Sequence, residues 1–125
     1  MKTKAIIEVA GSPKEHIEEV MTKVVEKIKS EQQILKYKIF EAQQKEKLFF
    51  TFTEMEIDFS NFEKLIGFCL DYFPSSIEII DEEVDIKRKE LENVTNDLLA
   101  KLHEYDMILK NLKAELYLLK NKSIS

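Results

Sequence analysis

The sequence predicts an α+β fold made of a small sheet domain and a long C-terminal helix. Short apolar segments that end at turn residues alternate with amphipathic helical segments across residues 4–81. Their order is strand, helix, strand, strand, helix, strand, which is the ferredoxin-like arrangement of a four-stranded antiparallel sheet with both helices on one face. Residues 84–120 contain no Gly or Pro, which favours one continuous helix. We therefore expect a domain over residues 1–82 and a helical extension over 83–125.

The first strand and the first helix are predicted at the N-terminus. Lys4–Ala10 is short and apolar and ends at Gly11. The following Ser-Pro-Lys-Glu is a typical helix start, because Ser12 can cap the helix, Pro13 suits its first position and Glu15 completes a capping box. The helix then presents one apolar face, made of Ile17, Val20, Met21, Val24, Val25 and Ile28.

Two strands, Ile34–Glu41 and Lys47–Asp58, are predicted next, joined by a polar turn around Gln43 and Gln44. A loop with an even number of residues places the apolar residues of both strands on one face, whereas a one-residue slip moves lysines into it. We therefore expect Ile39 to pair with Leu48 and Tyr37 with Phe50. The helices would cover the face made of Leu35, Tyr37, Ile39, Phe50 and Phe52.

A second helix is predicted from a second capping box, which begins at Ser60 and ends at Glu63. Pro74 ends this helix, and Ser76–Asp81 is the last strand. Phe68 and Tyr72 lie off the expected core face of the helix. That face consists of Phe62, Leu65, Ile66, Cys69, Leu70 and Phe73.

The C-terminal helix carries a heptad pattern, which is typical of a helix that packs along another helix. Apolar residues recur at its a and d positions, and we expect the interface to consist of Leu91, Leu98, Leu102, Tyr105, Leu109, Leu112, Leu116 and Leu119. Additional apolar residues, Val94, Leu99 and Ile108, flank this line and favour a bundle or a helix shared with the sheet.

Charges beside the heptad favour self-association. In a parallel pair, each g position faces the e position five residues later on the partner helix. The three charged combinations are all attractive: Lys87 with Glu92, Lys101 with Asp106, and Glu115 with Lys120. Two other roles for the helix stay open, namely folding back over the sheet and pairing only with a different protein. Parallel and antiparallel pairing also stay open.

The uncovered face of the sheet is the second candidate contact surface. We expect Phe40, Phe49, Lys36 and Lys38 to lie on it. Exposed aromatic residues among lysines can stack RNA bases, but Glu54 and the acids that follow it would repel phosphates. Cover by a second subunit or by the C-terminal helix is the simpler interpretation, since large apolar patches usually mark contacts.

Composition excludes several classes of function. The net charge is -5, which does not suit a nucleic-acid partner. The single Cys69 excludes an intrachain disulfide, and with His16 and His103 on separate elements no metal site, cofactor or catalytic residue is expected. No segment is long and apolar enough for a secretion signal or a membrane span, so we expect a cytoplasmic protein that does not bind membranes.

The turn at Gly11-Ser12-Pro13 joins the first strand to the first helix. This segment resembles the first turn of ACT-type amino-acid-sensing domains, which share the predicted topology and bind ligands at subunit interfaces. The resemblance implies a small-molecule sensor as an alternative function. The function we expect is a non-enzymatic interaction or assembly module that homodimerises through its C-terminal helix and has room for a further protein partner.

Overall fold

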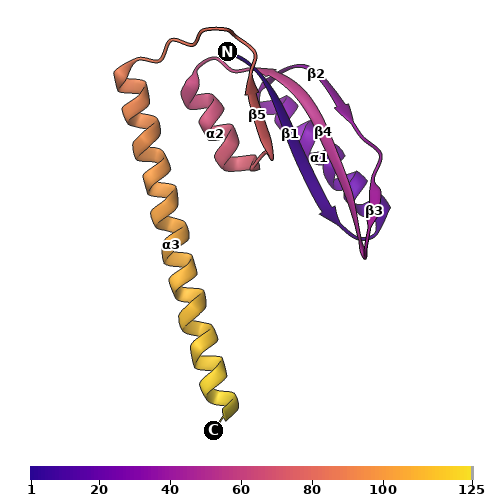
Figure 1. Cartoon of the computed structure of the whole chain (residues 1–125), viewed down its shortest axis with the longest axis vertical. Coiled ribbons are helices and arrows are strands. Elements are labelled where there is room, and N and C mark those ends of the chain that lie inside the picture. Colours follow the sequence, from indigo (N-terminus) through magenta and orange to yellow (C-terminus); the bar gives the residue numbers. More distant parts are fainter. Residues whose placement is uncertain (125) are drawn as a thin grey trace. The chain divides into compact units, whose positions relative to one another are not determined.

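The structure, a computed structural model, describes residues 1–124, with side chains described through residue 122. It contains two compact units, Met1–Ile86 and Lys87–Ser125. The first unit consists, in chain order, of β1 (Lys2–Gly11), α1 (Lys14–Glu31), β2 (Gln33–Ile39), β3 (Gln43–Lys45), β4 (Leu48–Asp58), α2 (Phe62–Tyr72) and β5 (Ser76–Ile79) (Figure 1). The second unit is one helix, α3 (Arg88–Ile124). The predicted α+β class, with an antiparallel sheet and a long C-terminal helix, is confirmed.

The sheet has five strands where four were expected. Its order is β2-β4-β1-β5, with β3 also paired to β4, and all the pairs are antiparallel. The expected second strand is divided into β2 and β3, which both pair with β4. Between them the Phe40 backbone N–H still donates to the Phe52 carbonyl oxygen at 2.9 Å. Ala42 is buried, and its N–H donates to the Glu18 carboxylate at 3.4 Å. The division therefore lies where the chain turns toward α1.

The register of this hairpin differs from the expected one. Its turn lies at Glu46 and the following lysine, beyond the glutamines where we expected it, and Glu46 has a positive φ of 59°. Ile39 pairs with Thr53, so the predicted pairing of Ile39 with Leu48 is wrong, as is that of Tyr37 with Phe50. The shift from Leu48 to Thr53 is an odd number of residues, so β4 presents the opposite face to the helices.

The face of β4 under the helices carries its odd-numbered residues. Thr51, Thr53, Met55 and Ile57 are at most 1% exposed. The threonines suit this face because the Thr51 hydroxyl donates to the Phe40 carbonyl oxygen at 2.6 Å and the Thr53 hydroxyl donates to the Lys38 carbonyl oxygen at 2.8 Å. A bonded hydroxyl avoids the cost of burying an unsatisfied polar group. The expectation that the helices cover Phe50 and Phe52 is therefore wrong, because both share the opposite face with Glu54.

Helix α1 packs on the sheet through the predicted apolar face. Ile17, Met21, Val25 and Ile28 are buried. The expected capping box is absent, since the N-cap residue is Pro13 and no side chain caps the helix. Gly11 has a steric reason, because an added Cβ would lie 3.0 Å from the Ile17 Cγ2 atom. The glycine therefore lets α1 lie close to the end of β1.

Helix α2 completes the core, on a face different from the one expected. Asn61 caps the helix, its Oδ1 atom accepting the Lys64 N–H at 2.9 Å. Phe68 is 2% exposed, and its ring lies 5.3 Å from that of Phe59. Phe73 is 65% exposed and ends the helix with a positive φ of 47°. The expected places of Phe68 off the core and Phe73 in it are therefore wrong.

The aromatic contact with Phe59 explains which face of α2 is buried. The ring of Tyr72 lies 5.2 Å from that of Phe68, and Tyr72 also packs against the core, in contrast to the expected position. Leu65, Phe68 and Tyr72 follow steps of three and four, so they form a helical stripe as regular as the expected one. Phe59, buried just before the helix, selects this stripe.

Two phenylalanine truncations in α2 test this core. We expect Phe68→Ala to lower the free energy of unfolding by about 3–5 kcal/mol, because it removes a buried ring and leaves a cavity. Phe73→Ala, the matched control at an exposed position, should lower it by less than about 1 kcal/mol. Urea denaturation followed by circular dichroism measures both. Equal losses for the two variants would show that α2 packs through a different face.

Candidate interaction surfaces

The first candidate surface is the apolar line along α3, which we call the seam. The helix has 37 residues, which makes it about 55 Å long at 1.5 Å per residue. All the leucines of the seam are 40–64% exposed, and Tyr105 is half-buried. The structure thus places all the expected interface residues on one helix. They are Leu91, Leu98, Leu102, Tyr105, Leu109, Leu112, Leu116 and Leu119.

Apolar residues also lie beside the seam. Leu99 at an e position and Ile108 at a g position are each 47% exposed. Met107, Tyr117 and Leu118 lie outside the seam and are 61–66% exposed. Exposed apolar surface of this extent marks a contact surface in most soluble proteins.

Ion pairs within α3 stabilise the helix itself. The Lys110 amine lies 2.8 Å from the Asp106 carboxylate, one helical turn before it. The Lys101 amine lies 3.7 Å from the Glu104 carboxylate.

The second candidate surface is the open face of the sheet. Lys36 and Lys38 pair with Glu56 and Glu54 across β2 and β4, so both lysines lie on this face as expected. Phe40 lies there too, because its ring stacks on that of Phe52 with centroids 4.2 Å apart and an angle of 17°. Phe49 has the parity of Thr51 and lies on the side of the helices, so its expected place on the open face is wrong.

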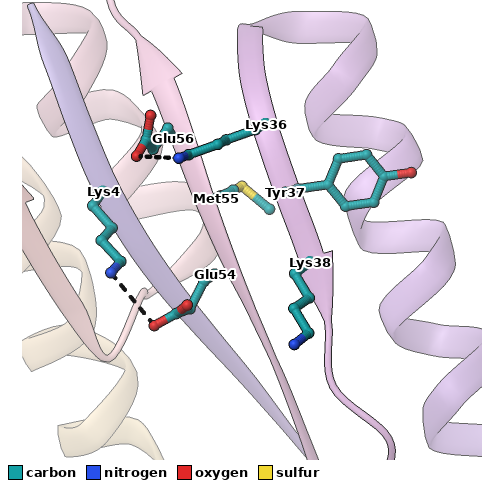
Figure 2. Close-up of a pocket in the computed structure, with 7 residues that line it drawn as sticks. All are labelled: Lys4, Lys36, Tyr37, Lys38, Glu54, Met55 and Glu56. Atoms are coloured by element: carbon teal, nitrogen blue, oxygen red, sulfur yellow. Dashed lines mark ion pairs between the residues drawn. The ribbon is translucent and has the colours of Figure 1, made fainter.

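Ion pairs neutralise much of this face. The Lys36 amine lies 3.3 Å from Glu56, and the Lys4 amine lies 3.6 Å from Glu54 (Figure 2). Lys38 lies over the Phe40 ring, its amine 4.6 Å from the ring centroid. These three lysines and two glutamates, together with two further residues, line a shallow pocket of about 190 Å³. The full lining is Lys4, Lys36, Tyr37, Lys38, Glu54, Met55 and Glu56. The face is therefore a charged ladder beside a small aromatic stack.

Tyr37 lies on the other side of β2. Its side chain extends toward a neighbouring helix in Figure 2, away from the two ion pairs. The Lys29 amine donates to the Tyr37 hydroxyl at 2.8 Å and lies 4.1 Å from the ring centroid. This contact joins α1 to the edge strand of the sheet.

Comparison with known proteins gives one match. The model of the MJ0538 family matches residues 2–119. The chain belongs to the MJ0538 family. The match begins with β1 and ends at Leu119, the last residue of the seam, so the region matched by the MJ0538 family model includes both the sheet domain and the heptad pattern of α3. No curated protein and no solved structure matches the chain.

The residues with the most reactive side chains are scattered in this MJ0538 family member. Cys69 is half-buried on α2, whereas His16 and His103 are exposed on α1 and α3. Within residues 1–124, His, Cys, Asp and Glu form no group of three or more that could hold a metal ion. None of the helices in that range is long and apolar enough to cross a membrane.

Two groups in the core of the sheet domain have raised pKa values. Burial, and then the hydrogen bond that its hydroxyl donates to Glu31 at 2.7 Å, raise the pKa of Tyr72 to about 12. Burial alone raises the pKa of the Cys69 thiol. A raised thiol pKa lowers the fraction of reactive thiolate at neutral pH, so the structure favours a packing role for Cys69.

Thiol labelling tests this role. We expect the folded chain to react with Ellman's reagent at pH 7.5 at least about tenfold more slowly than the urea-unfolded chain, because the thiolate is both scarce and shielded. The rate should rise with pH, since the raised pKa leaves the thiol protonated at pH 7.5. Labelling of the folded chain as fast as that of the unfolded chain would contradict the packing role.

Proposed function

We propose that this MJ0538 family member is a non-enzymatic interaction and assembly module that homodimerises through α3. The observation that carries the proposal is the seam, a line of leucines that is 40–64% exposed along a 37-residue helix. Burying one leucine side chain stabilises by about 1.5–3 kcal/mol. A second copy of α3 offers the same line of leucines and so has a surface of matching chemistry and length.

The open face of the sheet is a poorer counterpart for the seam. Packing leucines on it would take the Lys4–Glu54 and Lys36–Glu56 pairs out of water. Desolvating ion pairs costs free energy that an apolar contact does not return. The charged ladder thus supports pairing between copies over the alternative in which the helix folds back on its own sheet.

The proposal includes three finer points. The helices of the two copies form a coiled coil, in keeping with the heptad pattern. The sheet domain has the ferredoxin-like arrangement, with β2 and β3 together taking the place of one strand beside β4. The working environment is the cytoplasm, which suits a chain whose single cysteine has no disulfide partner.

The sensor alternative has less support. Its motivating residue was Gly11, and the close approach of Ile17 accounts for that glycine through packing alone. RNA binding through the open face has the Phe40–Phe52 stack and Lys38 in its favour. However, two glutamates share that face and are already paired with lysines, so the face lacks the positive charge that phosphates require.

Two apolar-to-acid substitutions test homodimerisation. Leu109 lies in the seam and Met107 lies outside it, yet they are 55% and 64% exposed in the single chain. We expect Leu109→Asp to weaken the dimer at least about 100-fold, because it places a charge from each copy in the paired surface. Met107→Asp should leave the dimer intact. Sedimentation equilibrium of each full-length variant at roughly 1–100 micromolar measures the dissociation constant of the dimer.

The matched exposure makes the comparison specific. If α3 were a lone exposed helix, the two substitutions would have the same effect on mass and on stability. A wild-type chain that remains monomeric at the highest concentration would refute homodimerisation. Equal weakening of the dimer by both substitutions would show that the contact surface is not confined to the seam.

A further inference from the structure

We infer that the two copies of α3 pair in parallel and in register, so that each residue of the seam faces its own counterpart. This inference rests on the proposed homodimer and specifies its geometry. The sequence pattern left the direction of pairing open. The charges at the e and g positions, together with the bounds of α3, now favour one direction.

Parallel pairing in register gives opposite signs to each combination of two charges on the flanks of the seam, counting Lys87, which directly precedes the first residue of α3. The g-to-e combinations with two charges are Lys87 with Glu92, Lys101 with Asp106, and Glu115 with Lys120. Each combination occurs twice in a symmetric pair. Since the signs are opposite in all of them, parallel pairing in register brings no like charges together on the flanks.

The two remaining g-to-e combinations are also compatible with this arrangement. Val94 would face Leu99; Val94 is already 7% exposed in the single chain, so the added burial in this combination comes from Leu99, which is 47% exposed. Ile108 would face Lys113, whose aliphatic stem can cover an apolar neighbour while its amine stays in water. The two exposed apolar residues beside the seam, Leu99 and Ile108, thus gain partners in the same alignment that matches the charges.

Reversed pairing cannot match the same charges. When one helix is reversed, g positions face g positions and e positions face e positions. The charged g residues are Lys87, Lys101, Glu115 and Lys122. An alignment that joins Lys87 to Glu115 places Lys101 against its own copy, and one that joins Lys101 to Glu115 leaves Lys87 beyond the end of the partner helix. Each reversed alignment therefore loses at least one attractive contact.

The one layer of like charges in the parallel pair lies at the helix end. Arg88 is at an a position and would face Arg88 of the second copy. It is the first residue of α3, its side chain is 89% exposed, and its guanidinium lies 3.4 Å from Glu92. The like charges can therefore separate into water at the end of the seam without disturbing the leucine layers.

Parallel pairing has a consequence for assembly. Because each sheet domain precedes α3 in the chain, both domains are attached at the same end of the helix pair. The Leu116–Leu119 segment lies at the other end. The module would therefore present two identical sheet domains together to any further partner.

Disulfide cross-linking in the full chain tests the direction. Leu91 and Leu116 lie near opposite ends of the seam, and Cys69→Ser removes the native thiol. We expect Leu91→Cys and Leu116→Cys, each in the Cys69→Ser background, to form an interchain disulfide in more than half of the chains in a glutathione buffer. His103→Cys, at an exposed b position, is the control and should stay below a tenth. Non-reducing gel electrophoresis measures the fraction.

A spin label outside the seam gives a second measurement that leaves the leucines intact. Asn121→Cys in the Cys69→Ser background places the label on an exposed f position near the end of α3. Parallel helices about 8–10 Å apart should hold the two labels within roughly 30 Å of each other, whereas reversed helices would hold them about 45 Å apart. Pulsed electron resonance measures this distance.

The outcomes separate the inference from the proposed function. Cross-links at both ends, or the short label distance, support parallel pairing in register. A dimer in sedimentation with the long label distance and no self-cross-link at either end overturns the inference and leaves homodimerisation standing. A monomer in sedimentation overturns both.

Discussion

The structure of the sheet domain depends on the alternation of side chains along β4. This strand pairs with β1, β2 and β3, so its two faces determine what lies under the helices and what faces outward. The inward residues end in Met55 and Ile57, and Phe59 continues the core just beyond the strand. The outward residues end in acids that pair with lysines of both neighbouring strands. Moving β4 by one residue would bury three carboxylates, so the register is strongly determined.

The order of the elements could be predicted from the sequence because it follows from apolar periods and turn residues. The faces of β4 could not be predicted from its most apolar members. Phe50 and Phe52 suggested burial, whereas Thr51 and Thr53, which alternate with them, are the buried residues because their hydroxyls reach backbone carbonyls of β2 and its extension. The sequence at the C-terminal end of β4 indicates the buried face more clearly, because Met55 and Ile57 alternate there with acidic residues. Three charges on one side outweigh two aromatic residues.

Helix faces were predictable where one apolar stripe dominates and ambiguous where two compete. In α1 the predicted stripe is buried as expected. In α2 two stripes share Leu65, and the buried Phe59 ring decides between them through contact with Phe68. That contact joins residues outside and inside the helix, so a periodicity confined to the helix does not contain it. The seam of α3 was the clearest pattern in the chain, and all its residues lie on one helix.

The seam differs from the rest of the described chain in how its side chains are accommodated. Among the residues that the structure describes, every buried side-chain nitrogen and oxygen in an unexposed residue has a hydrogen-bond partner. The exposed apolar residues of the sheet domain are distributed over several elements, with Leu35 at the bulge of β2, Leu48 beside the hairpin turn, Phe73 at the end of α2 and Ile79 in β5. On α3 the exposed leucines of the seam instead form one line along the helix. A continuous line is what a second helix can bury, and the acids and lysines on its flanks then determine which helix and in which direction.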